Sequence, residues 1–236
     1  MREEKQSKYQ KKTETFSGAR FEFPLDNLQK DIVSSMYHNQ ISILTGDPGT
    51  SKTYMMCHFA LKQLTHRAVS KIIISKSPVE TGKGIGFLPG EIDDKLAPFK
   101  DSYIDILNKI AGEPYIRYCI EKKLITFEPM GFVRGKSFED SVIILDEAQN
   151  CSIQELMSFS SRICENSKML FGGDFYQIDI KNSGLKDFIN ICGGIESINY
   201  TTLGSEFQKR SKIITDMFNN YKKFIDNDPL WKKQLS

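Results

Sequence analysis

The sequence has no long apolar run, no close pair of cysteines and almost no net charge. No apolar stretch approaches the roughly 18 residues that a membrane-spanning helix needs, so we expect no bilayer span. The five cysteines are odd in number and contain no Cys-x-x-Cys pair, which favours free thiols over disulfides or a zinc site. The three histidines also lack metal-ligand spacing. Because the first residues contain no hydrophobic signal region, we expect a cytoplasmic protein.

The composition is that of a soluble globular chain, with 39% hydrophobic and 26% charged residues among 236. This length is enough for one ordinary domain with a proper core. A net charge of +2 excludes a broadly basic surface, so any nucleic-acid site must be local. We expect a flexible polar tail over residues 1–18, a single domain over 19–225 and a short C-terminal tail over 226–236.

Short apolar runs alternate with segments of helical periodicity along the domain. Strands are predicted at 41–45, 71–75, 124–128, 141–145, 168–172 and 195–200. Helices are predicted from a cap at Asp26 or Asn27, at 52–66, as a broken pair within 91–122, and at 152–165, 184–191 and 205–225. This βαβ order predicts an α/β fold with a mostly parallel sheet and right-handed crossovers. The last helix is expected to pack onto the sheet through Phe207, Ile214, Met217, Phe218, Tyr221 and Ile225.

The stretch from Ile41 to Thr53 combines a buried strand, a glycine-rich turn and Lys-Thr at the start of a helix. Backbone N–H groups at such a helix start form a cradle for phosphate, the lysine can reach the β- and γ-phosphates, and the threonine can bind Mg²⁺. The alternative is a simple Gly/Pro turn with a chance Lys-Thr pair. The candidate nucleotide-binding residues are Gly46, Asp47, Pro48, Gly49, Thr50, Ser51, Lys52 and Thr53.

Ser51 is a departure, because glycine usually precedes the lysine of such a loop. If this position requires a positive φ, serine costs roughly 1 kcal/mol or more. We expect nucleotide binding to persist, whereas the effect on turnover is left open.

A second apolar strand ends in Asp146 and Glu147. Ligands of open α/β sheets lie at the carboxyl ends of the strands. There an aspartate can hold Mg²⁺ and a following glutamate can activate water, provided that Glu147 lies past the strand end. The alternative is a solvated Asp-Glu turn.

Two further polar residues are candidates for the same site. Gln177 follows the apolar strand at 168–172 and Asp174, and its amide can contact a γ-phosphate and the attacking water. Arg210 is a candidate for stabilising charge in the transition state, from the same or a neighbouring subunit.

These motifs together resemble the PhoH-like family of ATPases, whose core is similar to superfamily 1 helicases. The resemblance spans roughly residues 25–215. Its most specific parts are Gly86-Phe87-Leu88-Pro89-Gly90 and Asp146-Glu147-Ala148-Gln149-Asn150. Arg134-Gly135 and Gly173-Asp174-Phe175-Tyr176-Gln177-Ile178-Asp179 also fit, in the same order along the chain.

The resemblance implies a three-layer, RecA-like P-loop NTPase core that uses ATP and Mg²⁺. It implies that Lys52 and Thr53 hold phosphate and metal, and that Asp146 and Glu147 are the metal-side and catalytic carboxylates. It also implies coupling by Gln177, adenine recognition by Gln29 and a late arginine at Arg210. The sequence departs from the family pattern at Ser51 and at the pair Phe175-Tyr176.

Nucleic acid and a second subunit are the partners that the resemblance implies. A lone core lacks the second wall of a helicase cleft, so we expect a homo-oligomer, a ring such as a hexamer. The candidates for contacting single-stranded RNA or DNA are Lys76, Lys83, Phe87, Arg134 and Lys136. The alternative is that Phe87 packs in the core and the cations are solvated.

Three functions remain open from the sequence. The first is an oligomeric nucleic-acid-dependent ATPase, with helicase or translocase activity as one form. The second is a P-loop phosphotransferase, against which a water-activating carboxylate argues. The third is a nucleotide-binding regulatory switch with slow or no hydrolysis, which Ser51 keeps open.

Overall fold

The computed structural model describes residues 19, 21, 24–77, 92–133 and 135–227 of the chain. Its centre is a six-stranded sheet with the order β3-β2-β4-β5-β1-β6, in which all neighbours run parallel. The strands are β1 (Ile41–Gly46), β2 (Lys71–Lys76), β3 (Ile125–Phe127), β4 (Ser141–Asp146), β5 (Lys168–Gly173) and β6 (Ile198–Leu203). The expected parallel α/β architecture is therefore confirmed.

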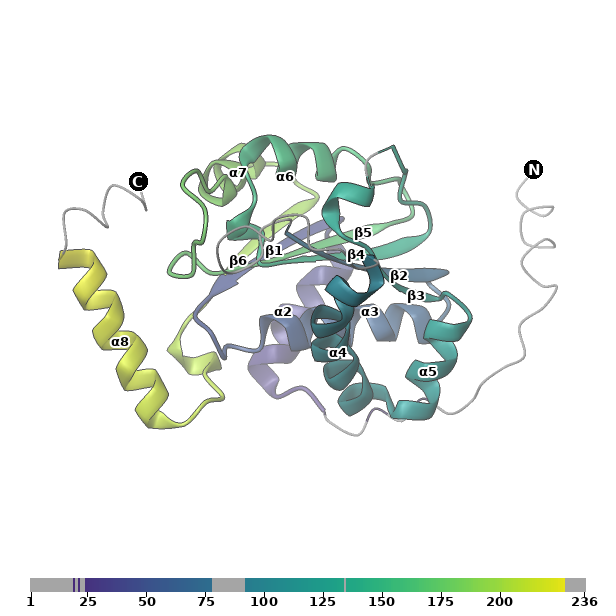
Figure 1. Cartoon of the computed structure of the whole chain (residues 1–236), viewed down its shortest axis with the longest axis horizontal. Helices are drawn as coiled ribbons and strands as arrows, with labels where there is room; N and C mark the ends of the chain where they lie inside the picture. The colour runs from purple at the N-terminus through teal and green to yellow at the C-terminus, as the bar shows by residue number, and fades with distance from the viewer. Residues whose placement is uncertain (1–18, 20, 22–23, 78–91, 134, 228–236) are drawn as a thin grey trace.

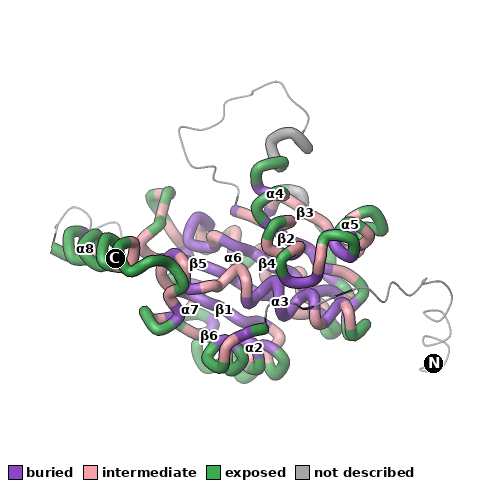
Figure 2. The backbone as a smooth tube through the Cα atoms, turned by 90° about the horizontal axis from the view of Figure 1, so that it is seen from below, coloured by how far each residue is buried: buried purple, intermediate pink, exposed green. Residues whose placement is uncertain are grey.

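Helices cover both faces of this sheet and complete three layers (Figure 1). One face carries α2 (Asn27–His38), α3 (Lys52–Thr65), α4 (Ile92–Ala111) and α5 (Glu113–Glu121). The opposite face carries α6 (Ile153–Ser160) and α7 (Leu185–Cys192). The burial colours show the four inner strands β2, β4, β5 and β1 as the buried centre of the molecule (Figure 2). Both faces need helices because parallel strands are apolar on both sides.

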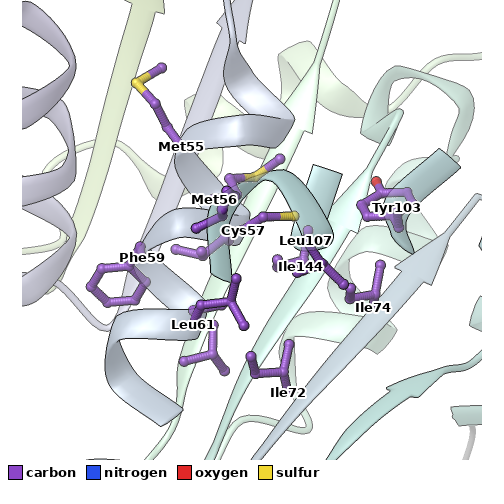
Figure 3. Close-up of a cluster of buried hydrophobic side chains, with 14 of the residues drawn as sticks. Met55, Met56, Cys57, Phe59, Leu61, Ile72, Ile74, Tyr103, Leu107 and Ile144 are labelled. Atoms are coloured by element: carbon purple, nitrogen blue, oxygen red, sulfur yellow. The ribbon is translucent and has the colours of Figure 1, made fainter. Parts of the chain in front are cut away.

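Alternate residues of each strand enter different cores, as the period of a strand requires. Ile72, Ile74 and Ile144 point toward α3 and α4, where Phe59 and Leu107 are fully buried (Figure 3). The neighbouring residues Ile73, Ile143 and Leu145 belong to the second core, with Phe159 and Phe188. The runs of consecutive isoleucines thus supply apolar side chains to both cores.

The C-terminal segment differs from the sequence-based expectation. Instead of one helix over 205–225, the chain forms a short 3-10 helix η3 (Ser205–Phe207) and a separate helix α8 (Lys212–Asn227). This helix lies to one side of the three layers rather than on the sheet (Figure 1). Ile225 is its one buried residue, whereas Met217 is 61% exposed. The predicted packing onto the sheet is wrong, because residues 208–210 leave the helical path to bond the loop after β1.

Three smaller boundaries also differ. Helix α6 ends at Ser160, five residues early, because the backbone of Arg162 and Cys164 bonds Phe138. Strand β6 begins at Ile198, where it pairs with Ile41, three residues later than expected. Between the predicted strands at 124–128 and 141–145, the chain forms a 3-10 helix, η1 (Met130–Val133). The expected tail at 1–18 lies outside the described residues. The tail expected at 226–236 begins inside α8, which continues to Asn227, and residues 228–236 lie outside the described residues.

Two expectations about absent features can be compared with the described residues. No helix among them is long and apolar enough to cross a bilayer. All five cysteines lie in the described part of the chain, and each is a free thiol.

Candidate active site

The loop after β1 has the backbone of a phosphate cradle. Thr50 closes a tight turn, in which its N–H and Oγ1 both donate to the Asp47 carbonyl, at 3.3 and 2.8 Å. Gly49 has φ +87°, and a Cβ there would lie 2.3 Å from Gln208 Oε1. Ser51 is left-handed, with φ 68° and ψ 22°, and lies at the start of α3 without a side-chain cap bond. Position 51 therefore has the positive φ at which serine is strained.

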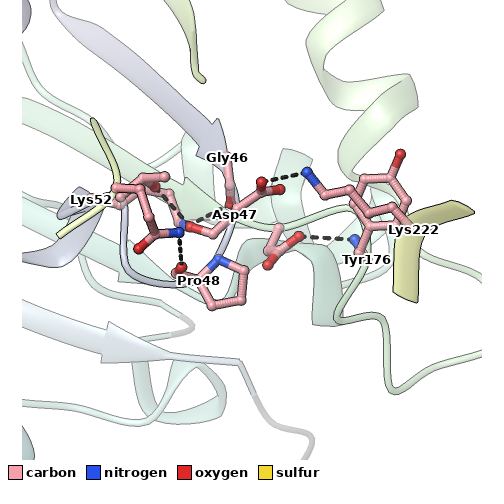
Figure 4. A network of polar contacts seen from close by, with 9 residues as sticks. Gly46, Asp47, Pro48, Lys52, Tyr176 and Lys222 are labelled. Atoms are coloured by element: carbon pink, nitrogen blue, oxygen red, sulfur yellow. Dashed lines mark hydrogen bonds and ion pairs between the residues drawn. The ribbon is translucent and has the colours of Figure 1, made fainter. Parts of the chain in front are cut away.

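Lys52 and Thr53, the first residues of α3, face different parts of the site. Lys52 Nζ donates to the carbonyls of Gly46 and Asp47, at 2.6 and 3.0 Å, and so lies over its own loop (Figure 4). Thr53 Oγ1 donates to Asp146 Oδ2 at 2.7 Å. That bond joins the phosphate loop to the predicted metal-side carboxylate, 93 residues away in sequence.

Asp146 is the last residue of β4, and its carboxylate is held by three donors. Besides Thr53, the buried phenol of Tyr103 on α4 donates to Oδ2 at 2.6 Å, and the Glu147 N–H donates to Oδ1 at 3.0 Å. The neighbouring strand makes room through Gly172, where a Cβ would lie 2.6 Å from Asp146 Oδ1. Tyr103 was not found from the sequence, because it lies on a helix outside every motif.

Glu147 lies just past the strand end, as the catalytic interpretation requires. Its backbone is left-handed, at φ 55° and ψ 38°, and it caps the 3-10 helix η2 (Ala148–Asn150). Burial and the neighbouring Asp146 raise the pKa of its carboxyl above the ordinary value. The bond from Gln149 and the charges of Lys52 and Lys76 oppose that increase. A carboxylate with a raised pKa is a better proton acceptor.

Gln149 and Asn150 join the Asp-Glu-Ala-Gln-Asn run to the loop after β5 by hydrogen bonds. The fully buried Gln149 donates to Glu147 Oε2 at 2.6 Å and to the Gln177 carbonyl at 3.0 Å. Its Oε1 accepts the Asp174 N–H at 3.0 Å. Asn150 makes a pair of bonds with Asp179, at 2.7 and 3.0 Å. The two loops are therefore one hydrogen-bonded unit, which leaves the Gln177 side chain exposed at its edge.

Asp174 is a further buried carboxylate beside the phosphate loop. Its Oδ1 accepts the Tyr176 N–H at 2.9 Å, while Oδ2 is buried and has no hydrogen-bond partner among the described residues. Burial raises its pKa, and the Tyr176 N–H, Lys52 and Lys222 act against this. Burial lowers the pKa of Lys52, whereas Asp174, Asp146, Glu147 and Asp47 act to raise it. The site thus holds one buried lysine among several carboxylates.

Residues 208–210 cross the outer side of the phosphate loop. Gln208 Nε2 donates to the Pro48 carbonyl at 2.9 Å, and the Lys209 N–H donates to the Gly49 carbonyl at 3.0 Å. The stem of Arg210 lies against Gly49, within 2.9 Å of the position of an added Cβ. The structure therefore places Arg210 beside the loop of its own chain.

Gln29 lies near the same side, at the start of α2. It forms a capping box with Asp26, in which each side chain accepts the other's backbone N–H, and Gln29 is buried. Asp26 also pairs with Lys209 at 2.6 Å, which ties α2 to the segment on the phosphate loop. This position is compatible with the adenine role that the resemblance implies, and that role stays a prediction.

Two of the five nucleic-acid candidates lie in the described residues. Lys76 ends β2 opposite Asp146, with Nζ 5.9 Å from the Phe99 ring centroid. Lys136 pairs with Glu128 at 2.7 Å and is largely solvated. Lys83, Phe87 and Arg134 lie outside the described residues, so the grouping of the five stays a prediction.

The donor set suits Mg²⁺ better than a metal held by protein alone. Among the described residues, no group of three His, Cys, Asp or Glu side chains could hold a metal ion. Mg²⁺ is typically bound by one or two protein oxygens together with substrate phosphates. Thr53 and Asp146 supply such oxygens, and the unpartnered Asp174 Oδ2 adds a buried negative charge nearby.

Comparison with known proteins agrees with these motifs. The family model described as "PhoH-like protein" matches residues 24–222. The PhoH-like protein of Bacillus subtilis is 31% identical over 198 residues, which cover 83% of this chain and 62% of that protein. Protein PhoH of Escherichia coli is 30% identical over 190 residues, which cover 78% of this chain and 54% of that protein.

The fold also matches solved structures. The large terminase of a thermophilic bacteriophage aligns with a TM-score of 0.54 at 8% identity, over 89% of this chain and 52% of that one. At this low identity, the structural likeness shows a shared fold and no more. The curated relatives are longer, so the chain matches only about half to three fifths of their lengths. On the match over residues 24–222, the chain belongs to the PhoH-like family.

Proposed function

We propose that this chain binds ATP and hydrolyses it in a Mg²⁺-dependent reaction. The observation that carries the proposal is the 2.7 Å hydrogen bond from Thr53 to Asp146. It joins the phosphate loop to the carboxylate at the end of β4, which are the two halves of a P-loop nucleotide site. Glu147 follows directly and lies past the strand end, where it can face a reacting phosphate.

Each residue has a defined part in this reaction. The N–H groups at the start of α3 bind phosphate oxygens, and Lys52 exchanges its bonds to the Gly46 and Asp47 carbonyls for bonds to phosphate. Glu147 accepts the proton of a water whose oxygen attacks the γ-phosphorus. The bond from that phosphorus to the bridging oxygen breaks, and ADP leaves with the electron pair.

Thr53 and Asp146 would hold Mg²⁺, which supplies positive charge to the phosphate oxygens and the leaving group when it is bound. Asp146 needs a fixed orientation for this role, and its three hydrogen-bond donors provide it. Gln149 keeps Glu147 in place and links it to the loop that carries Gln177.

Steady-state release of phosphate from ATP tests the proposal directly. The wild-type chain should turn over ATP with Mg²⁺ and lose turnover in EDTA. Lys52→Ala should lose nucleotide binding and turnover together. Glu147→Gln should keep binding and lose roughly 10²–10⁴-fold in kcat, the typical contribution of a general base. Turnover that is unchanged in both variants would contradict the assignment of this site.

We extend the proposal to a partner, single-stranded RNA or DNA, and to a homo-oligomer. What supports a strand is the position of Lys76, opposite Asp146 in the sheet and close enough to Glu147 to act on its pKa. A backbone phosphate bound there would change the charge beside the catalytic carboxylate. The oligomer is supported by the exposed apolar side chains of α8, such as Met217 and Phe224, which a second copy would cover.

Single-stranded RNA and DNA, added separately to the hydrolysis assay, test this extension. Turnover should rise with one of them, and strand affinity should fall as salt is raised, because phosphate contacts release counterions. Lys76→Met should weaken the stimulation, whereas the exposed Lys109→Met on α4 should not. Turnover that no strand alters would direct the search to another substrate, including a phosphoryl acceptor.

A regulatory switch is the second candidate, and the left-handed backbone of Ser51 favours it. A strained loop can bind nucleotide while positioning it poorly for attack by water. Tight ATP binding with no turnover, together with turnover in Ser51→Gly, would establish the switch rather than the hydrolase.

A further inference from the structure

Lys222 of α8 reaches the phosphate loop from outside every motif that the sequence singled out. Its Nζ forms an ion pair with Asp47 Oδ2 and lies 5.0 Å from the ring centroid of Tyr176 (Figure 4). Both side chains of the pair are mostly buried, at 23% and 18% exposure. Lys222 therefore bridges the loop after β1 and the loop after β5, although α8 is otherwise the most exposed helix.

Asp47 places a negative charge where a polyanion has to bind. Its carbonyl accepts Lys52 Nζ, and its carboxylate is one of the charges that act on the pKa of Lys52. An uncompensated carboxylate on the phosphate-binding loop would oppose the binding of a polyanion, and would oppose it more strongly for each added phosphate charge. A partly buried pair is little screened by salt, so a counter-charge held there stays effective.

Tyr176 gives the lysine a defined position. It belongs to the pair Phe175-Tyr176, at which this sequence departs from the family pattern, and its ring faces the ammonium group. In such a cation–π contact the ring attracts the ammonium group although the ring carries no net charge. Asp174, whose carboxylate has one unpartnered oxygen, is also within the influence of Lys222. The lysine thus belongs to the same group of charges as Lys52.

We infer that Lys222 is a positioning residue of the nucleotide site, which neutralises Asp47 so that the phosphate loop accepts a triphosphate. This makes α8 a part of the nucleotide site. The inference rests on the proposed function, because it names a further residue for the same ligand.

The test is the affinity of the purified 236-residue chain for ATP and for ADP, in a double-mutant cycle. Lys222→Met should weaken ATP binding by roughly tenfold or more, a loss of the size that one unpaired charge near a surface produces. The loss should be smaller for ADP, which carries less charge. In the Asp47→Asn background, the same Lys222→Met change should weaken ATP binding far less than it does in the wild-type chain. Lys222→Arg should retain binding.

The matched control is Lys223→Met, the exposed neighbour in the same helix. It should bind both nucleotides as wild type does. If Lys222 only fastened α8 to the body, Lys222→Met would affect ATP and ADP equally and Asp47→Asn would not rescue it, which would overturn the inference. Equal affinity of Lys222→Met and wild type would overturn it as well. Wild-type protein that binds no nucleotide would overturn the proposed function first, and this inference with it.

Discussion

Ser51 holds a backbone conformation that disfavours its own side chain. Its φ of 68° lies in the left-handed region, and its hydroxyl makes no capping bond with α3. In this conformation the Ser51 carbonyl accepts the Met55 N–H at 3.0 Å, which is a hydrogen bond at the start of α3. Strain of this kind at a binding loop is typical of functional sites.

Ser51→Gly should therefore raise the stability of the protein. Relief of about 1–2 kcal/mol of left-handed strain exceeds the extra entropy of glycine in the unfolded chain, about 0.5–1 kcal/mol, so the net gain is small but positive. Chemical denaturation measures the free energy of unfolding. Ser51→Ala, which keeps the Cβ and removes only the hydroxyl, is the control and should show no gain. A gain of equal size in both variants would contradict the strain.

His58 on α3 gives a prediction about pH. It is buried against Phe21 and Tyr54, its Nδ1 has no hydrogen-bond partner among the described residues, and burial lowers its pKa from 6.5 to about 4. The charge of Lys62 is the smaller part of this decrease. The unfolded chain then binds the proton more readily than the folded one, so stability falls as pH decreases from about 6.5 to about 4.

Unfolding free energies at several pH values in this window measure the effect. His58→Gln removes the titrating group and should flatten that part of the pH dependence. The exposed His66→Gln is the matched control and should keep the wild-type slope. If His58→Gln has the same slope as wild type, the histidine is not the responsible group.

At the scale of elements, the site depends on how loops after different strands are joined. Strands β4 and β5 are neighbours, so the loops that follow them meet at one edge of the sheet. Gln149 donates to Glu147 and to the Gln177 carbonyl and accepts from Asp174. A single buried amide thus sets the position of the carboxylate relative to the loop that carries Gln177.

Gln149→Leu should lower kcat by at least roughly tenfold and leave nucleotide affinity within about threefold. The side chain keeps its volume but leaves Glu147 unheld and buried polar groups unpaired, which costs about 1–3 kcal/mol for each group. Phosphate release and nucleotide binding are the two measurements. The exposed Gln154→Leu on α6 is the control. Equal losses of affinity and kcat would indicate general damage to the fold rather than mispositioning.

At the scale of the whole molecule, α8 presents an unusual surface. Its exposed apolar residues fall on one stripe, at spacings of four, four and three: Ile213, Met217, Tyr221 and Phe224. Lys222 lies on a different side of the helix, and the buried Ile225 follows Tyr221 by one turn. Exposed apolar stripes of this kind are typical of interaction surfaces, and the proposed homo-oligomer is the occupant that we expect.

Replacing Met217 and Phe224 with Lys should reduce the size of any assembly. The two cations interrupt the stripe without touching Lys222 or the site, so nucleotide affinity should stay at the wild-type value. Light scattering after size-exclusion chromatography measures the mass. Substituting the exposed polar residues Gln154 on α6 and Asn190 on α7 with Lys adds the same charge away from the stripe and should leave the mass unchanged. An equal loss of mass in both variants would assign the effect to charge alone.

The sequence by itself determined the sheet and the order of the motifs along its carboxyl edge. Apolar runs such as Ile72–Ile74 and Val142–Leu145 specify strands buried on both faces, and the loop ending in Lys52-Thr53 predicts a phosphate cradle, because both signals are local. The order of these motifs sufficed to place Asp146 and Glu147 at the carboxyl edge of a parallel sheet.

Only the tertiary structure decided which distant groups complete the site. Tyr103 and Lys222 lie on helices with ordinary apolar patterns, and their contacts with Asp146 and Asp47 join residues 43 and 175 positions apart. The last helix was misplaced for a related reason. Its periodicity continues from Phe207 to Ile225, but the Gln208 side chain and the Lys209 N–H form hydrogen bonds with the phosphate loop instead. Local pattern cannot report a competing partner that is distant in sequence.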